Sequence, residues 1–281
     1  MTTFGETAKN ALTDMLKIRK EVLETVEGSW RRLTPADLEK TLLNTYEIDK
    51  QALKVAMKNL VADGELSYTY QFGCSFLEKS FNKPTRVSKR VVLKPPGVFY
   101  KPKSDDVVVE LQQGASFGSG EHPTTRLSIR GIEKALSKIE IFRENSDTRV
   151  LDIGTGSGVL AIVAVALGAG EAVGIDIDPC AIAEAKENVK INNLENRIEI
   201  YNRDLENIDQ RFSLITANLR YPTLKRLCSV MAERLAEGGS AVVSGVKTEE
   251  VSDLLSVFTR RNFRCIWEAT EKDWTGLVFV R

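Results

Sequence analysis

The spacing of apolar residues divides the chain into a helical first part and a longer part in which strands and helices alternate. Over residues 4–26, apolar side chains recur every three or four positions, which predicts one buried face of a long helix. The sequence Thr-Pro-Ala-Asp at residues 34–37 is a capping box with a proline in the first turn, and it predicts the start of a second helix. Asp49 is expected to cap a third helix over residues 50–62, which ends before Gly64.

The period of the pattern changes after the third helix. Apolar and polar residues alternate over 66–72, Gly73 interrupts them, and residues 74–77 return as a second strand, which predicts a β-hairpin. Three helices and a hairpin resemble a winged helix, so we expect residues 1–82 to form a helical, winged-helix-like domain. Such domains bind nucleic acid through the third helix, or they mediate protein docking or dimerisation, and the sequence leaves both interpretations open.

From residue 149 onward the pattern is that of an α/β fold. Short apolar strands alternate with helical stretches, which is typical of a doubly wound, Rossmann-like sheet. The expected strands lie at residues 149–153, 172–176, 197–201, 212–217, 240–244, 263–268 and 276–280, with a turn at residues 237–239. In such a sheet the ligand-binding loops follow the carboxyl ends of the strands.

The first strand of this sheet runs into a loop with three glycines, Gly154, Gly156 and Gly158, and then into an apolar helix over residues 159–167. This arrangement is found at the start of nucleotide-binding folds, because small residues let the backbone approach the ligand. The second strand ends at Asp176, about 20 residues after the first glycine, where a carboxylate accepts hydrogen bonds from ribose hydroxyls.

Two positions indicate the kind of nucleotide. The dinucleotide fingerprint needs a glycine at position 159, where this chain has Val159. Asp152, two residues before the first glycine, would repel a pyrophosphate but suits a ligand that carries an amino group and a sulfonium. S-adenosylmethionine is such a ligand, and we expect it to be the cofactor.

Three further residues are candidates for contact with the ligand or the substrate. Asp204 follows the third strand and is expected either to accept from the adenine amino group or to cap a turn. Asn218 ends the fourth strand, where it either faces the transferred methyl group or forms a turn before a proline. Tyr221 either packs against the reacting group or is a plain core or rim tyrosine. We predict that Asn218, which would orient the amine, and Tyr221, which would wall the pocket, are the catalytic residues.

A loop rich in glycine and hydroxyl residues, at 114–125, precedes a helix that we expect to begin near Arg126. Its threonines and N–H groups are suited to covering a carboxylate at the helix N-terminus. His122, the only histidine of the chain, either anchors this loop or contacts the substrate.

Composition excludes several classes of protein. With 281 residues, 42% of them apolar, the chain can bury large cores, and its longest apolar run, nine residues, is too short to span a bilayer. Four cysteines without Cys-x-x-Cys spacing and a single histidine argue against a metal site. We therefore expect reduced thiols in a cytoplasmic protein without a membrane partner.

Charge is unevenly distributed although the net charge is zero. Residues 79–103 contain eight basic residues, four prolines and no acidic residue. Proline disfavours helix, so we expect an extended linker over residues 83–106 between the two domains. The basic strip either faces the phosphates of a nucleic acid or ribosome, or only solvates the linker.

Four motifs in this order resemble the ribosomal protein L11 methyltransferase (PrmA) family. They are Phe-Gly-Ser-Gly-Glu-His-Pro-Thr-Thr at 117–125, Leu-Asp-Ile-Gly-Thr-Gly-Ser-Gly at 151–158, Gly-Ile-Asp-Ile-Asp-Pro at 174–179 and Ala-Asn-Leu at 217–219. The resemblance covers residues 107–281. It implies a class I methyltransferase fold, S-adenosylmethionine as methyl donor, and N-methylation of amino groups of a ribosomal protein.

By motif position, the family's cofactor contacts fall on Thr125, Gly154, Asp176 and Asn218. The full set of cofactor-binding residues that we expect is Phe117, Gly118, Thr124, Thr125, Asp152, Gly154, Gly156, Asp176, Ile177, Asp204 and Asn218. No metal is expected to take part.

The family's usual substrate-recognition domain has ferredoxin-like topology, which residues 1–90 do not match. We expect a protein N-methyltransferase, and because this domain is not matched two alternatives for the substrate stay open. One is a small-molecule methyltransferase whose winged-helix domain forms a homodimer. The other is a nucleic-acid methyltransferase that uses the basic strip.

Overall fold

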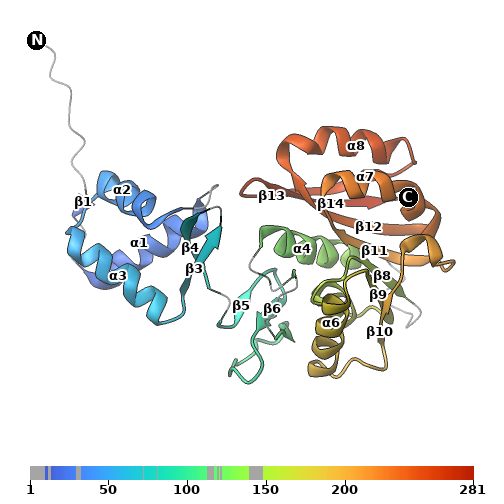
Figure 1. The fold of residues 1–281 in the computed structure, drawn as a ribbon, viewed down its shortest axis with the longest axis horizontal. Helices are drawn as coiled ribbons and strands as arrows, with labels where there is room; N and C mark the ends of the chain where they lie inside the picture. Colours follow the sequence, from blue (N-terminus) through green and yellow to red (C-terminus); the bar gives the residue numbers. More distant parts are fainter. Residues whose placement is uncertain are drawn as a thin grey trace, which may run out of the picture. The chain divides into compact units, whose positions relative to one another are not determined.

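The chain divides into two compact units, Met1–Lys83 and Pro84–Arg281 (Figure 1). The computed structural model describes residues 10–11, 14–29, 33–71, 73–80, 82–112, 117–118, 120, 122–138 and 148–281. Each unit has a hydrophobic core of its own.

The first unit consists of three helices followed by an antiparallel hairpin. Its helices are α1 (Met15–Gly28), α2 (Pro35–Thr45) and α3 (Lys50–Ala62), and its hairpin strands are β3 (Leu66–Gln71) and β4 (Cys74–Lys79). The two-residue strands β1 (Asn10–Ala11) and β2 (Tyr46–Glu47) pair in parallel. One face of each helix is buried, and the hairpin adds Leu66 and Leu77 to the same core.

Helix starts in this unit follow their capping residues. At α2 the Thr34 hydroxyl accepts from Asp37 N–H and the Asp37 carboxylate accepts from Thr34 N–H, both at 3.1 Å, which confirms the predicted capping box. Asp49 caps α3 as predicted. The first helix was predicted from residue 4, but α1 begins at Met15 because Asp14 caps it. Residues 10–11 form β1 instead, and residues 1–9 and 12–13 of that prediction lie outside the described residues.

A seven-stranded sheet in the order β10-β9-β8-β11-β12-β14-β13 forms the centre of the second unit. Its parallel strands are β8 (Arg149–Ile153), β9 (Glu171–Asp176), β10 (Ile198–Asn202), β11 (Phe212–Asn218) and β12 (Leu235–Lys247), and its antiparallel strands are β13 (Arg264–Glu271) and β14 (Trp274–Val280). The strand order reverses between β8 and β11. Ligands bind at such a switch point, outside the carboxyl ends of the strands.

Helices cover both faces of this sheet (Figure 1). On one face lie α4 (Pro123–Lys138), α5 (Val159–Ala166) and α6 (Pro179–Ile191), and on the other lie α7 (Tyr221–Arg234) and α8 (Val251–Thr259). Almost all of α5 is buried, which explains why its sequence is apolar on every side. The predicted doubly wound α/β fold is therefore confirmed, with a mixed rather than an all-parallel sheet.

Residues 237–239, which were predicted to form a turn before a strand, lie inside β12. The pairing of β12 with β11 shifts from Leu235 opposite Phe212 to Ser240 opposite Leu214. Gly238 adopts φ +71° at this point. The glycines therefore accommodate a bulge within one long strand, a feature whose local sequence resembles that of a turn.

The segment that we predicted to be a linker belongs to the second unit. Strands β5 (Thr85–Arg86), β6 (Val91–Lys94) and β7 (Val107–Glu110) form a small three-stranded sheet. The apolar residues of β6 are buried, with Val91, Val92 and Leu93 at most 3% exposed. The four prolines of this segment lie in the connections, where they leave the strands intact. The second unit therefore begins at Pro84 rather than at residue 107.

Replacing Val92 by alanine tests this correction. Val92→Ala removes buried methyl groups and should lower the free energy of unfolding by about 2 kcal/mol, measured by urea denaturation. The control Lys89→Ala changes an exposed residue of the same segment and should leave the urea midpoint unchanged. If both variants unfold at the wild-type midpoint, the segment contributes no folded core.

Candidate functional site

The loop between β8 and α5 holds its three glycines in the left-handed region, with φ of +69° at Gly154, +54° at Gly156 and +82° at Gly158. The N–H groups of Gly154 and Thr155 both donate to Ile175 O at 2.9 Å, which ties the loop to the end of β9. A Cβ on Gly156 would lie 2.4 Å from Phe117 O. Glycine is therefore required here for both conformation and space.

Phe117 and Gly118 lie directly against this glycine loop. The Phe117 carbonyl accepts from Ser157 N–H at 2.9 Å, and a Cβ on Gly118 would lie 2.5 Å from Ser157 Oγ. The Phe117 side chain stays 52% exposed. The structure thus brings together the first two sequence motifs, although residues 114–116, 119 and 121 of that region lie outside the described residues.

Asp176 ends β9 beside the same loop. Its carboxylate accepts from Gly156 N–H at 2.9 Å and from Asp178 N–H at 3.0 Å. An ionised carboxylate has about four acceptor positions, so about two remain for the hydroxyls of a ligand. The next residue, Ile177, exposes 74% of its surface and offers an apolar contact at the sheet edge.

Asp152 lies beneath the loop and is fully buried. The hydroxyls of Thr155 and Thr216 each donate to its carboxylate at 2.7 Å. Burial raises the pKa of Asp152 to about 6, although these hydrogen bonds oppose the shift. In this structure Asp152 supports the loop from inside, and its contact with the amino group of a ligand stays a prediction.

Helix α4 begins three residues earlier than expected, and its first N–H groups are already hydrogen-bonded. The helix begins at Pro123, and His122 takes up the first N–H groups, since Nδ1 accepts from Thr124 N–H at 3.3 Å and its carbonyl accepts from Thr125 N–H at 3.1 Å. The Thr124 hydroxyl also lies 2.8 Å from His122 Nδ1. These N–H groups are therefore not available to a carboxylate. The contacts favour an anchoring role for His122, which also packs between the rings of Phe117 and Trp274.

Two hydroxyls near the loop have no hydrogen-bond partner among the described residues. They are Thr125 Oγ1 and Ser157 Oγ, and both are buried. A buried polar group without a partner costs about 1–3 kcal/mol, so such groups occur where a ligand or water completes the site. Both hydroxyls therefore fit a polar ligand bound over the glycine loop.

Asn218 and Leu219 complete the site at the end of β11. Asn218 pairs with Ser244 across the sheet, and no hydrogen bond of its side chain is present among the described residues. A Cβ on Gly154 would lie 2.6 Å from a Leu219 methyl carbon, so the two loops are in contact. Asp204, after β10, is exposed and makes no capping bond with its side chain. Its carboxylate is thus available, as predicted for a ligand contact.

The structure does not bring Tyr221 to the glycine loop through its hydroxyl group. This hydroxyl donates to the Asp253 carboxylate on α8, and Lys225 Nζ donates to the same carboxylate at 3.1 Å. The ring packs against the apolar core under α7. These contacts anchor Tyr221 at the start of α7, and its role as a wall beside the reacting amine stays a prediction.

Sequence reasoning missed several residues that hold the site together. Asn188 on α6 is fully buried, and it donates to Ser157 O and accepts from Gln112 N–H, both at 2.9 Å. One turn further, Asn192 makes two hydrogen bonds with the backbone of Glu110. Two asparagines four residues apart on the buried side of a helix are the signal that could have identified this clamp.

A second set of contacts links α4 to the far edge of the sheet. Arg126 donates to Gly120 O at 2.9 Å and to Glu271 at the end of β13 at 2.7 Å. Arg130 forms a salt bridge with the same carboxylate. Because these partners are far apart in the sequence, no local pattern predicts them.

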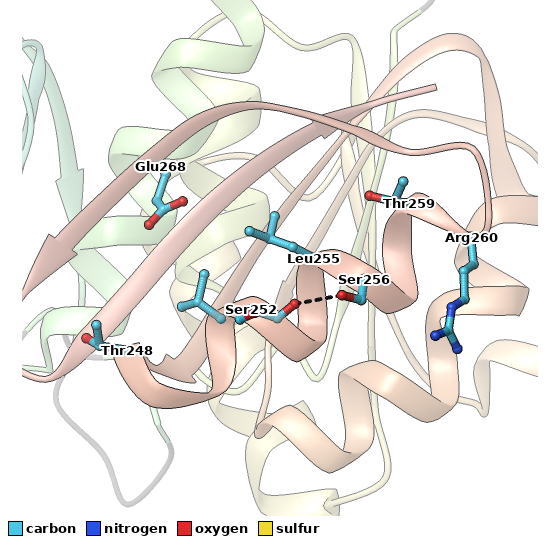
Figure 2. A pocket seen from close by; sticks show the side chains of 8 residues that line it. Thr248, Ser252, Leu255, Ser256, Thr259, Arg260 and Glu268 are labelled. Atoms are coloured by element: carbon cyan, nitrogen blue, oxygen red, sulfur yellow. Dashed lines mark hydrogen bonds between the residues drawn. The ribbon is translucent and has the colours of Figure 1, made fainter.

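A cavity of about 730 Å³ lies elsewhere, between α8 and β13 (Figure 2). Its lining residues are Thr248, Val251, Ser252, Leu255, Ser256, Thr259, Arg260 and Glu268. Figure 2 shows Ser256 turned back onto its own helix, where its hydroxyl donates to Ser252 O at 3.0 Å. None of the predicted site residues lines this cavity, so we place the functional site at the glycine loop.

The described residues also limit the kinds of site that we consider. Among them, no group of three or more His, Cys, Asp or Glu side chains is arranged to hold a metal ion. Within the same residues, no helix combines the length and the apolar character that crossing a bilayer requires.

Comparison with known proteins places this site in a family. The model of the family described as ribosomal protein L11 methyltransferase (PrmA) matches residues 76–281, which is most of the chain. The chain belongs to the PrmA family. The match begins within the hairpin of the first unit, so the three helices of that unit lie outside it.

Curated relatives of the PrmA family are similar over the same region. The chain is 37% identical over 196 residues to the ribosomal protein L11 methyltransferase of Geobacter sulfurreducens, covering 70% of this chain and 62% of the relative. It is 34% identical over 204 residues to the protein of that name in Heliobacterium modesticaldum, covering 72% and 62%. The chain thus spans less than two thirds of the length of these relatives.

A solved PrmA-family structure has the same fold. The crystal structure of a ribosomal protein L11 methylase from Lactobacillus delbrueckii subsp. bulgaricus superimposes with a TM-score of 0.64 at 28% identity. The match covers 71% of this chain and 98% of the other. The α/β methyltransferase fold predicted from the sequence is therefore confirmed.

The contact between Gly156 and Phe117 can be tested by adding one methyl group. Gly156→Ala should lower the free energy of unfolding by more than the ~1–2 kcal/mol that a left-handed alanine costs, because its Cβ meets Phe117 O. Gly238→Ala is the matched control, since Gly238 has φ +71° with no atom within 4 Å of an added Cβ. Equal losses in urea denaturation would contradict the close approach.

The burial of Asp152 predicts a pH dependence of stability. Its pKa is about 6 in the folded protein and near 3.8 when unfolded, so between these values only the folded state keeps the proton. The contribution of Asp152 therefore falls as pH rises from about 4 to 6, by about 3 kcal/mol in total. Urea denaturation of Asp152→Asn and wild type should show a difference that changes with pH over this window.

The control for this measurement is Asp105→Asn, because Asp105 is exposed and no ion pair of its side chain is present among the described residues. The difference between this control and wild type should not change with pH. A difference for Asp152→Asn that is constant from pH 4 to 7 would contradict the buried, raised pKa.

Proposed function

We propose that this chain is an S-adenosylmethionine-dependent methyltransferase that acts on amino groups of a ribosomal protein. The observation that carries the proposal is the left-handed glycine loop at the switch point of the sheet, joined to Asp176 and to two buried hydroxyls without partners, in a chain of the PrmA family. The curated relatives are named for action on ribosomal protein L11. Because the chain spans only part of the length of these relatives, the proposal for its activity is based on the residues of its own site.

The residues at the sheet edge fit the parts of this cofactor. Asp176 retains acceptor positions for the ribose hydroxyls, and the exposed carboxylate of Asp204 suits the adenine amino group. Ile177 and Phe117 offer apolar surface for the adenine ring. The buried Thr125 hydroxyl, which has no partner among the described residues, suits the methionine carboxylate.

Asp152 adds an electrostatic contribution. With a pKa near 6 in its buried position, it is ionised at neutral pH, and a cationic ligand over the loop favours the ionised form further. Its two hydroxyl partners stay in place, so the charge acts through the loop rather than through solvent. This arrangement favours a cation such as a sulfonium over a pyrophosphate.

When bound, S-adenosylmethionine supplies an activated methyl group for direct displacement by a nucleophile. The nucleophilic amine must first lose a proton, and a free lysine has a pKa of about 10.4. Exclusion of water by the surrounding loops lowers that pKa, because burial disfavours the charged ammonium. The side-chain oxygen of Asn218, which has no partner within the described residues, accepts an N–H of the amine and orients its lone pair.

The first unit is proposed to be a winged-helix-like module that docks a protein partner. Support comes from the succession of α1, α2, α3 and the hairpin along the chain. In addition, Leu33 forms an isolated antiparallel β-bridge with Leu77 of the hairpin. On α3, Lys50 and Lys54 both approach Glu39, at 3.6 and 3.9 Å. This acid reduces the positive field of the helix that would enter a DNA groove, which favours protein docking or dimerisation.

Transfer of labelled methyl groups tests the proposal. The full chain, incubated with methyl-labelled cofactor and a ribosome-containing cell extract, should label the protein fraction. Acid hydrolysis of that fraction should release amino acids that carry the labelled methyl group on nitrogen. Label in the RNA or small-molecule fraction instead would contradict the proposed acceptor.

Asp176→Ala should abolish this labelling, because loss of the ribose contacts lowers cofactor affinity by about 100-fold, measured by calorimetry with S-adenosylhomocysteine. The control is Asp178→Ala, which removes the cap of α6 two residues away and should leave the affinity near wild type. Unchanged affinity of Asp176→Ala would refute the cofactor site.

A further inference from the structure

Half of the basic residues between Lys79 and Lys103 are neutralised by acids in the folded chain. The ion pairs are Lys79–Glu27 at 2.6 Å, Lys83–Glu65 at 3.0 Å, Arg86–Asp106 at 2.6 Å and Lys94–Glu110 at 2.7 Å. These four cations therefore stabilise their own units and offer little charge to a partner. The strip identified in the sequence reduces to four remaining basic residues.

The remaining four lie in two neighbouring connections of the small sheet. Lys89 and Arg90 occupy the turn between β5 and β6, and Lys101 and Lys103 lie between β6 and β7. Arg90 Nε donates to Asp105 O at 3.4 Å, which brings the two connections together. All four residues are exposed, and no ion pair of their side chains is present among the described residues.

Phe99 projects from the second of these connections. It is 87% exposed, the most exposed large apolar side chain of the described residues. A single exposed phenylalanine is ordinary at a protein surface, so the informative feature is its place beside four basic side chains without ion pairs. We name the five residues Lys89, Arg90, Phe99, Lys101 and Lys103 the Phe99 surface.

A buried carboxylate fixes the shape of this surface. The Asp106 side chain is only 3% exposed and accepts from Tyr100 OH at 2.6 Å, from Arg86 at 2.6 Å and from Lys103 N–H at 3.0 Å. The hydrogen bond from Tyr100, followed by those from Lys103 N–H and Arg86, lowers the pKa of Asp106 to about 2. The residues on both sides of Phe99 are further restrained by prolines at positions 95, 96 and 102. The backbone on both sides of Phe99 is thus restrained before any partner arrives, which reduces the entropy lost on binding.

We propose that the Phe99 surface binds single-stranded RNA, with a base stacked on Phe99 and backbone phosphates on the four basic side chains. An aromatic ring among cations is the combination that proteins use for unpaired nucleic acid. An apolar protein partner would need further exposed apolar residues beside Phe99, whereas its direct neighbours Val98 and Tyr100 are half-buried and the next exposed residues are Gly97 and Lys101. Asp105 is exposed, and the Glu133 carboxylate accepts from Lys89 N–H at 3.1 Å, so the four cations of the Phe99 surface outnumber the two acids beside them.

The choice of RNA rests on the proposed function, because an acceptor on a ribosomal protein lies among RNA strands. The binding itself needs neither cofactor nor methyl acceptor. RNA binding and methyl transfer can therefore fail independently of each other.

Binding of a fluorescently labelled 12-nucleotide oligouridylate to the full chain, followed by anisotropy at several salt concentrations, tests the proposal. Phe99→Leu keeps an apolar side chain but removes the stacking face, and it should raise Kd about 10-fold. Phe99→Trp should retain the affinity, and its added fluorescence should be quenched by the bound base. An unchanged Kd for Phe99→Leu would overturn the stacking role and indicate an apolar partner instead.

The lysines are tested by the salt dependence of Kd. Lys101→Ala and Lys103→Ala should each reduce the slope of log Kd against log salt by about 0.7, the value for one phosphate of a single strand. The control Lys186→Ala removes an exposed lysine of α6 and should leave the slope unchanged. Equal slopes for all three variants, or no binding by the wild type, would overturn the proposal. Oligothymidylate DNA should bind with similar affinity, because stacking and phosphate contacts do not involve the 2′-hydroxyl, and failure of both oligonucleotides to bind would overturn the proposal. Intact RNA binding without methyl transfer would overturn the proposed function alone.

Discussion

The backbone of Gly156 is the point at which three segments of the functional site meet. Its N–H donates to Asp176 at the end of β9, and its missing side chain leaves room for the carbonyl of Phe117. The left-handed φ at this position directs the loop between those two neighbours. The position of the Asp176 carboxylate, the loop geometry and the segment at Phe117 therefore depend on one residue that has no side chain.

The site combines buried polar groups that are hydrogen-bonded with buried polar groups that have no partner among the described residues. Asn188 and the hydroxyls around Asp152 are fully hydrogen-bonded and hold the loop rigidly. By contrast, the Thr125 and Ser157 hydroxyls are buried without partners, and Asp152 carries a charge in a place that disfavours it. These costs are the expected signature of a surface shaped for a polar, cationic ligand, since binding would relieve them.

Local patterns predicted most elements of this chain because their causes are local. Thr34 and Asp49 cap helices from within four residues, and the strand, glycine turn and helix around Gly154 follow one another directly. The linker prediction failed because the buried residues of β6 were hidden by surrounding prolines and lysines. The hydrogen bond from the Tyr221 hydroxyl to an acid 32 residues away also has no local signal in the sequence. Likewise, the sequence identified Asp152 as a site residue but did not show its surroundings, because the hydroxyls that donate to it come from two elements.

The link between Tyr221 and Asp253 affects how natural variants of this chain are interpreted. Asp253 exposes 58% of its side chain, and a ranking of positions by burial would class a change there as harmless. Through the phenol, however, it holds the first turn of α7, which begins three residues after Asn218. A substitution at Asp253 would therefore alter the support of the segment after Asn218 without changing Asn218 itself.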